Sequence, residues 1–163
     1  MTAAEADDER ARLRLRDGVE RCLVGLFGGD WRLGELVATH GRLKLLLMAH
    51  APALAKELGR LVAAAVALPR AEVAGRYRAG VRAALASAPS RGRHVNALEH
   101  AAGYLRGRAG DEERRQLRAR IDAFGAGEVS LAEPLALVRQ GAARHQIAWL
   151  QQQIYLGGSG LEA

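Results

Sequence analysis

Two basic residues lie on the apolar face of one predicted helix, where their side chains could do chemistry. At about 100° per residue, the segment Thr39 to His50 belongs to a helix with a broad apolar arc. His40 and Lys44, one turn apart, point into the middle of that arc. A buried lysine costs free energy unless it is paired, neutralised or close to water. These residues therefore indicate either a buried hydrogen-bonded network or a pocket. The arc itself contains six residues: Leu33, Leu36, Val37, Leu43, Leu47 and Met48.

His40 and Lys44 have a structural and a functional interpretation. In the structural one, they form hydrogen bonds to Asn96 or Glu99 of a later helix. In the functional one, they form the floor of an anion-binding pocket, where a desolvated lysine could act as a base or a nucleophile. The sequence shows no matched second catalytic group, so a structural or binding role is favoured over catalysis.

A second stripe of polar and small residues follows the helix predicted after residue 90. Its members recur at i, i+4, i+7 and i+11, opposite an apolar face that includes His94. They are Asn96, His100, Gly103 and Gly107. Glycine inside a helix costs about 1 kcal/mol relative to alanine. The stripe therefore predicts either close approach of another helix or a groove that is open to a ligand.

Several other kinds of site are not supported by the sequence. Cys22 is the only cysteine and lies in line with apolar residues, so we interpret it as a small buried hydrophobic residue. One cysteine gives no internal disulfide and no iron–sulfur ligand set. His94 and His100, six residues apart, cannot bind one metal by themselves. Glycine-rich phosphate loops, dinucleotide motifs and nucleophile elbows are also missing from the sequence. We expect neither a metal nor a cofactor.

The positive charge of the chain is concentrated in residues 76–108. This stretch has seven arginines against one acid, Glu99, a surplus equal to the net charge of +6 of the whole chain. The arginines are Arg76, Arg78, Arg82, Arg91, Arg93, Arg106 and Arg108. A local basic excess suits the phosphates of RNA. The competing interpretation is compositional, because 22 of the 24 basic residues are arginine in a chain also rich in alanine and glycine.

The elements that position these residues are predicted to be helices. Half of the chain is apolar, only 4% is aromatic, and alanine, leucine and arginine are abundant. We expect a single all-α domain, a bundle of about seven to eight helices, over residues 8–156. Residues 1–7 are expected to be disordered, and residues 157–163 to form a flexible tail. Neither a signal peptide nor a membrane span is predicted, so we expect a soluble cytoplasmic protein.

Proline, glycine and the apolar period set the predicted helix limits. Asp30 is the expected N-cap of the second helix. Helices are expected at about residues 8–27, 30–50, 52–66, 70–87, 91–107, 111–124 and 134–145. Residues 147–155 form a short last helix or an extended segment.

Four blocks of the chain, in order, resemble the bacterial YbgA-like family. They are THGRLKLLLMAHAP (Thr39 to Pro52), RHVNALEHAAGY (Arg93 to Tyr104), the helix start from Asp111 to Leu117, and WLQQQIYL (Trp149 to Leu156). Together the similarity covers roughly residues 15–156. The family is a domain of unknown function, found alone or fused to a thiouracil or thiouridine desulfurase domain.

The resemblance implies an all-helical fold and a role in holding tRNA. The polar residues that match the family pattern are His40, Arg42, Lys44, His50, His94, Asn96, His100 and Tyr104. None has an implied catalytic role. We therefore predict a non-catalytic domain that binds structured RNA, with these residues lining a groove and the seven arginines contacting phosphates. Two alternatives remain: an adaptor that docks on a separately encoded desulfurase or another enzyme, and a small-molecule enzyme that uses Lys44 with His40 or His94.

Overall fold

The computed structural model describes residues 3–157, and helices are the only regular elements within this range. The elements in chain order are α1 (Ala3–Phe27), α2 (Leu33–His50), α3 (Pro52–Ala64), the 3₁₀ turn η1 (Ala65–Ala67), α4 (Arg70–Ala86), α5 (Arg91–Gly103), α6 (Asp111–Ala126), α7 (Ala132–Arg144), α8 (Ala148–Gln151) and the 3₁₀ turn η2 (Ile154–Leu156). Pro52 is the first residue of α3, where its fixed φ is compatible with helix and its missing N–H costs nothing. The all-α fold class is confirmed.

Two helix starts differ from the sequence prediction. Helix α1 begins at Ala3, so it includes most of the stretch that was expected to be disordered. Asp30 does not cap α2, which begins at Leu33. Instead, the backbone N–H of Arg32 donates to the Glu35 carboxylate at 2.6 Å. Residues 1–2 and 158–163, and with them nearly all of the predicted tail, lie outside the described residues.

Two helix ends also differ. Helix α5 ends at Gly103, not at Gly107. Gly107 lies in the following turn with φ +76°, in the left-handed region that glycine adopts most easily. The predicted stripe of Asn96, His100, Gly103 and Gly107 therefore does not continue to its last member. Helix α6 extends to Ala126, and Gly127, with φ +83°, ends it.

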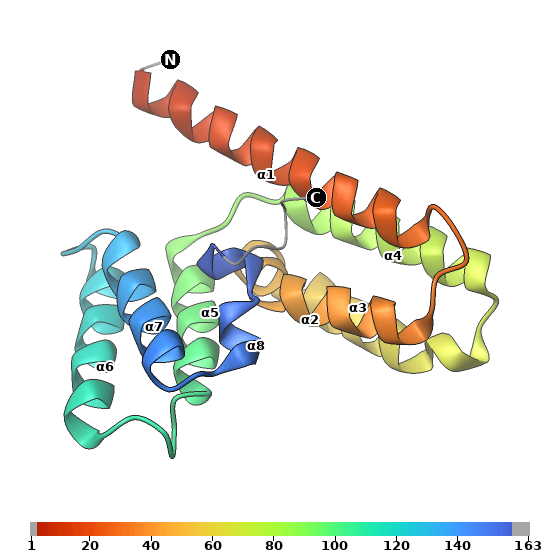
Figure 1. The fold of residues 1–163 in the computed structure, drawn as a ribbon. Coiled ribbons are helices and arrows are strands. Elements are labelled where there is room, and N and C mark those ends of the chain that lie inside the picture. Colours follow the sequence, from red (N-terminus) through yellow and green to blue (C-terminus); the bar gives the residue numbers. More distant parts are fainter. Residues whose placement is uncertain (1–2, 158–163) are drawn as a thin grey trace.

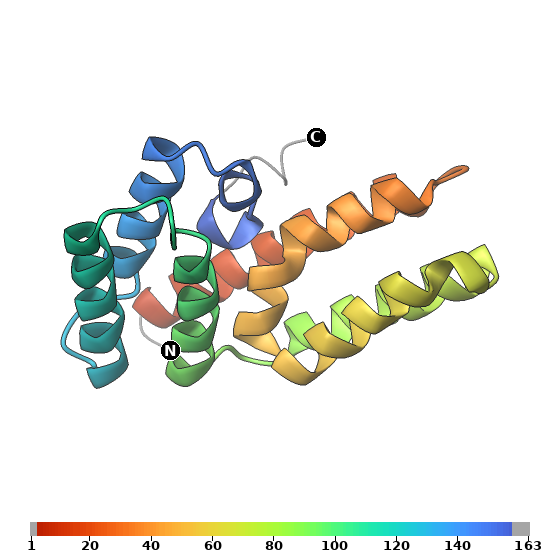
Figure 2. The same ribbon diagram turned by 90° about the horizontal axis from the view of Figure 1, so that it is seen from below.

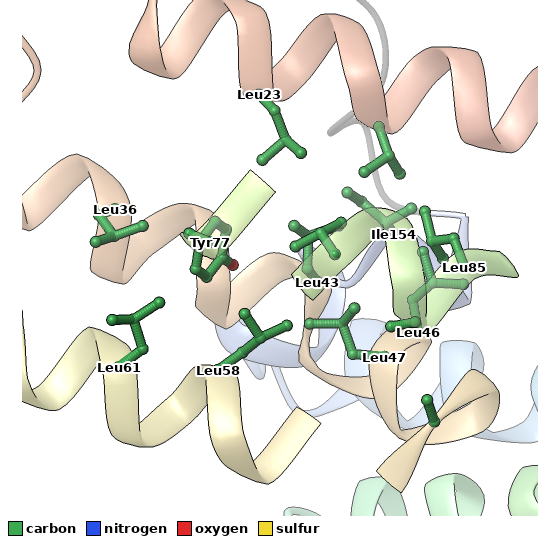
Figure 3. Packing of buried hydrophobic residues seen from close by; sticks show 14 of the residues in the cluster. Leu23, Leu36, Leu43, Leu46, Leu47, Leu58, Leu61, Tyr77, Leu85 and Ile154 are labelled. Atoms are coloured by element: carbon green, nitrogen blue, oxygen red, sulfur yellow. The ribbon is translucent and has the colours of Figure 1, made fainter. Parts of the chain in front are cut away.

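The helices form two groups that meet along α2. Helices α2–α4 and the C-terminal half of α1 lie on one side and α5–α8 on the other, while the N-terminal half of α1 extends beyond the first group (Figures 1 and 2). In the first group, α1, α2, α3 and α4 surround a core that includes Leu23, Leu43, Leu58 and the fully buried Tyr77 (Figure 3). Leu98, Ile121, Val138 and Leu150 belong to a second core, which is formed mainly by α5, α6, α7 and α8.

Helix α2 contributes to both cores, which explains its sequence. Leu43, Leu46 and Leu47 pack in the first core, whereas Leu45 packs in the second. A helix that is apolar on most sides is buried on most sides. The single apolar arc predicted from the sequence is therefore wrong in part: Val37, assigned to it, is 56% exposed. Within residues 3–157, no helix has both the length and the hydropathy needed to cross a bilayer.

Candidate functional site

The clearest cluster of aromatic and basic side chains lies where α2, α5 and α8 meet. Tyr104, at the end of α5, stacks on Trp149 of α8 with 4.1 Å between ring centroids and 14° between ring planes. His100 meets both rings edge-on, at 5.8 Å and 6.4 Å. Burial lowers the pKa of His100, and the positive charge of the nearby Lys44 lowers it further. We call Lys44, His100, Tyr104 and Trp149 the aromatic–cation cluster.

This cluster unites three of the predicted site residues with one that the sequence reasoning missed. Tyr104 is 37% exposed, and Trp149 is partly buried beneath it. The Nε2 atom of His100 is buried without a hydrogen-bond partner among the described residues. Trp149 was noticed only as part of a family-like block. Its contact with Tyr104 joins residues 45 positions apart, which no local pattern reports.

His40 points away from this cluster toward α4. Its Nδ1 and the hydroxyl of Tyr77 form a 3.0 Å hydrogen bond in the first core. Burial, and then the charge of Lys44, lower the pKa of His40, while burial raises the pKa of Tyr77. The predicted bond to Asn96 or Glu99 is therefore wrong for His40, which is hydrogen-bonded to Tyr77 instead. The arrangement favours a neutral histidine that links α2 to α4.

His50 and His94 lie together at a different junction, near the end of α2. The Nδ1–H of His50 donates to the carbonyl of Ser87 at 2.7 Å, and Arg93 donates to the carbonyl of His50 at 2.7 Å. His94 Nδ1 shares a 2.8 Å hydrogen bond with the hydroxyl of Tyr155, whose ring stacks beside it. These bonds join α2, the α4–α5 connection and η2.

Burial and nearby positive charge at this junction favour the neutral form of both histidines. Burial is the main cause that lowers the pKa of His50, and the nearby charges of Arg16, Arg12 and Arg93 lower it further. Burial also lowers the pKa of His94, with a smaller effect from His50. Because His94 lies here and not beside Lys44, only His40 of the two predicted catalytic partners of Lys44, His40 and His94, lies close to that lysine.

Two predicted groove residues lie apart from both groups. Arg42 faces α1, where its Nη2 lies 3.8 Å from the Cys22 sulfur, and the same atom lies 3.5 Å from the hydroxyl of Thr39 on α2. Asn96 is exposed on α5, and its side chain forms no hydrogen bond within the described part of the chain. The eight family-like residues therefore do not form a single groove.

The arginines on α4 are paired with acids. Arg76 donates to Glu72 one turn away at 3.0 Å. Arg78 and Arg82 both bind the carboxylate of Glu20 on α1. These hydrogen bonds and charges lower the pKa of Glu20 to about 2. Ion pairing thus reduces the charge that this part of the basic stretch presents to an external phosphate.

The other arginines of the stretch are mostly bound to backbone carbonyls. Arg91 donates to the carbonyl of Phe124 at 2.7 Å and lies over its ring. Arg93 donates to the carbonyl of His50 at the end of α2, and Arg108 reaches the carbonyl of His145 at 3.4 Å. Arg106 has no hydrogen bond or ion pair among the residues that the structure describes. Arg106 and Arg108 both follow Tyr104 in the turn after α5.

A cavity of about 280 Å³ between α5 and α6 lies beside this turn. Apolar residues such as Ala102, Leu105 and Ile121 line it, together with charged residues that include Arg106 and Glu113. No group of three or more histidine, cysteine, aspartate or glutamate side chains suited to a metal occurs within the described residues. The geometry therefore offers aromatic faces and cations, a combination suited to binding.

Comparison with known proteins places the chain in a family. Residues 44–158 match the family described as "Protein of unknown function (DUF1722)". The chain is 33% identical over 123 residues to the "Uncharacterized protein YbgA" of Escherichia coli (strain K12), covering 75% of this chain and 73% of that protein. No solved structure matches the chain. The chain therefore belongs to the YbgA-like family of proteins of unknown function.

Proposed function

We propose that this chain is a non-catalytic RNA-binding domain whose contact surface is the aromatic–cation cluster together with Arg106 and Arg108. The observation that carries the proposal is the stack of Tyr104 on Trp149 beside His100 and Lys44. Proteins recognise unpaired bases by stacking them on aromatic rings, and they bind the adjoining phosphates with lysine and arginine. Tyr104 is the exposed member of the stack and is the residue expected to meet a base.

The charge distribution supports this surface over the one on α4. Arg106 has no acidic partner in the described range, and Arg108 contacts only a backbone carbonyl. Arg76, Arg78 and Arg82 are paired with Glu72 or Glu20 (three ion pairs). A phosphate gains most from a cation whose charge is not already balanced. The resemblance to domains fused to thionucleoside desulfurases suggests tRNA as the RNA, and a desulfurase-type enzyme as the partner that would act on it.

The test is a salt series of binding to bulk tRNA and to duplex DNA. Tyr104→Ala should weaken tRNA binding by about tenfold, since stacking contributes about 1–3 kcal/mol per base. Arg106→Gln should reduce the dependence of log K on log salt by about one phosphate contact. Arg76→Gln is the matched control because Arg76 is paired with Glu72, and its binding should stay close to that of the wild type.

Two outcomes would contradict the proposal. Equal affinity for tRNA and duplex DNA would show that binding reflects charge alone. Unchanged tRNA affinity in both Tyr104→Ala and Arg106→Gln, with folding intact by circular dichroism, would remove this surface from consideration. A protein partner recovered in stoichiometric amount after nuclease treatment would then favour the adaptor alternative.

A further inference from the structure

A second cavity lies between α1 and α2, on a surface that the proposed RNA contact does not use. It has a volume of about 290 Å³ and is lined by Cys22, Gly25, Leu26, Glu35, Ala38, Thr39 and Arg42. These residues precede the segment 44–158 that matches the family. This volume is larger than a simple ion needs. The wall combines apolar groups with one guanidinium and one carboxylate.

Arg42 is poorly partnered for a partly buried charge. Among the residues that the structure describes, its Nη2 has two polar contacts, the Thr39 hydroxyl at 3.5 Å and the Cys22 sulfur at 3.8 Å, both longer than a strong hydrogen bond. Its Nε is buried and has no acceptor among residues 3–157, nor does Arg42 form an ion pair there. Buried charges in proteins are normally paired with an opposite charge.

The one acid in the cavity wall is occupied elsewhere. The carboxylate of Glu35 accepts the Arg32 backbone N–H at 2.6 Å, at the beginning of α2. There it offsets the positive end of the helix dipole. Glu35 still adds a negative charge to the wall, which disfavours a ligand with two negative charges more than a ligand with one. The apolar atoms of Leu26 and Ala38 also suit a ligand with an organic body.

We propose that this cavity binds a small organic carboxylate, with Arg42 pairing with the carboxylate group and Thr39 donating its hydroxyl. Arginine matches a carboxylate through two parallel N–H donors, and such charge-assisted bonds are stronger than neutral ones. The single charge of the ligand would supply the acceptor that the guanidinium lacks. The apolar part of the ligand would lie against Leu26 and Ala38.

Cys22 provides a built-in reporter, since it lines the cavity and is the only cysteine of the chain. The experiment measures the rate at which neutral iodoacetamide alkylates Cys22 in the whole protein, with sodium benzoate as the probe. Benzamide, the neutral analogue of the same shape, and sodium chloride at equal ionic strength are the controls. Benzoate at about four times its Kd should slow alkylation about fivefold, because only free protein reacts.

Variants assign the effect to the cavity. Arg42→Met keeps the apolar stem and should abolish protection by benzoate, while Thr39→Val should weaken it. Arg60→Met, on the exposed face of α3, should behave as the wild type. Circular dichroism shows whether Arg42→Met is folded. The comparison of benzoate with benzamide on wild-type protein tests the proposal even if that variant is not.

Three results would overturn the proposal. The first is no protection by benzoate up to about 20 mM, a concentration range that includes weak millimolar ligands. The second is equal protection by benzoate and benzamide. The third is equal protection by benzoate and inorganic phosphate. The last result would assign the cavity to simple oxyanions instead. None of these results bears on tRNA binding, which involves α5 and α8.

Discussion

The side chain of Gln153 attaches the C-terminal segment to α2 through hydrogen bonds. It is fully buried. Its Nε2 donates to the carbonyl of Gly41 at 2.6 Å and to that of Trp149 at 3.3 Å, and its Oε1 accepts the N–H of Leu45 at 3.3 Å. Gln153→Met keeps the length of the side chain and removes all three hydrogen bonds.

The expected loss follows from those three bonds. A buried neutral hydrogen bond contributes about 0.5–1.5 kcal/mol, and here one bond is short and two are long. The substitution should therefore lower the free energy of unfolding by about 2–3 kcal/mol. At about 2–4 °C per kcal/mol for a chain of this size, the melting temperature should fall by about 4–12 °C.

Urea unfolding, followed by far-UV circular dichroism and by tryptophan fluorescence, measures this loss. Gln152→Met is the matched control because Gln152 is the exposed neighbour, and it should stay within about 0.5 kcal/mol of the wild type. A Gln153→Met protein that is equally close to the wild type would refute the argument, since the three bonds would then contribute nothing net.

Two further predictions concern packing and pH. A Cβ at Gly80 would lie 2.6 Å from a Leu58 methyl, so Gly80→Ala should cost about 1–3 kcal/mol in urea unfolding. Gly75→Ala, on the same helix with nothing within 4 Å, should be neutral or slightly stabilising; equal effects in both variants would contradict this reasoning. The folded state also lowers the pKa of four histidines, which therefore bind fewer protons when folded than when unfolded. They are His40, His50, His94 and His100. The stability that these histidines contribute should be fully present at about pH 7.5 and should be lost as the pH falls toward 5. A urea unfolding midpoint that stays constant or rises as the pH is lowered over this range would contradict this prediction.

Local sequence was sufficient for most of the helices, because a helix is set by residues within a few positions of one another. On α4, Val73, Tyr77 and Ala84 recur with the helical period, and all three are buried. Pro52 and Pro69 separate helices for reasons of backbone geometry alone. Helix ends were less predictable. The turn at Gly107 continues a helical pattern in sequence, yet α5 stops at Gly103.

Charge and site geometry required the tertiary structure. The local count of residues 76–108 predicted a basic surface, but Glu20, which is 58 and 62 residues away from its two partners, pairs with both Arg78 and Arg82 and offsets one of their two positive charges. Neighbours in sequence carry no information about such a pairing, because it depends on how α1 packs on α4.

The sequence by itself determined an all-helical chain, a lysine and a histidine on the most apolar helix, and the family to which the chain belongs. Only the tertiary structure decided that His40 bonds Tyr77, that Lys44 lies near His100, and that Tyr104 stacks on Trp149. The physical reason is the position of α2 between two cores. Both apolar sides of α2 are buried, so the packing of the surrounding helices determines which neighbour each polar residue of α2 contacts. The helical period of the sequence does not contain this information.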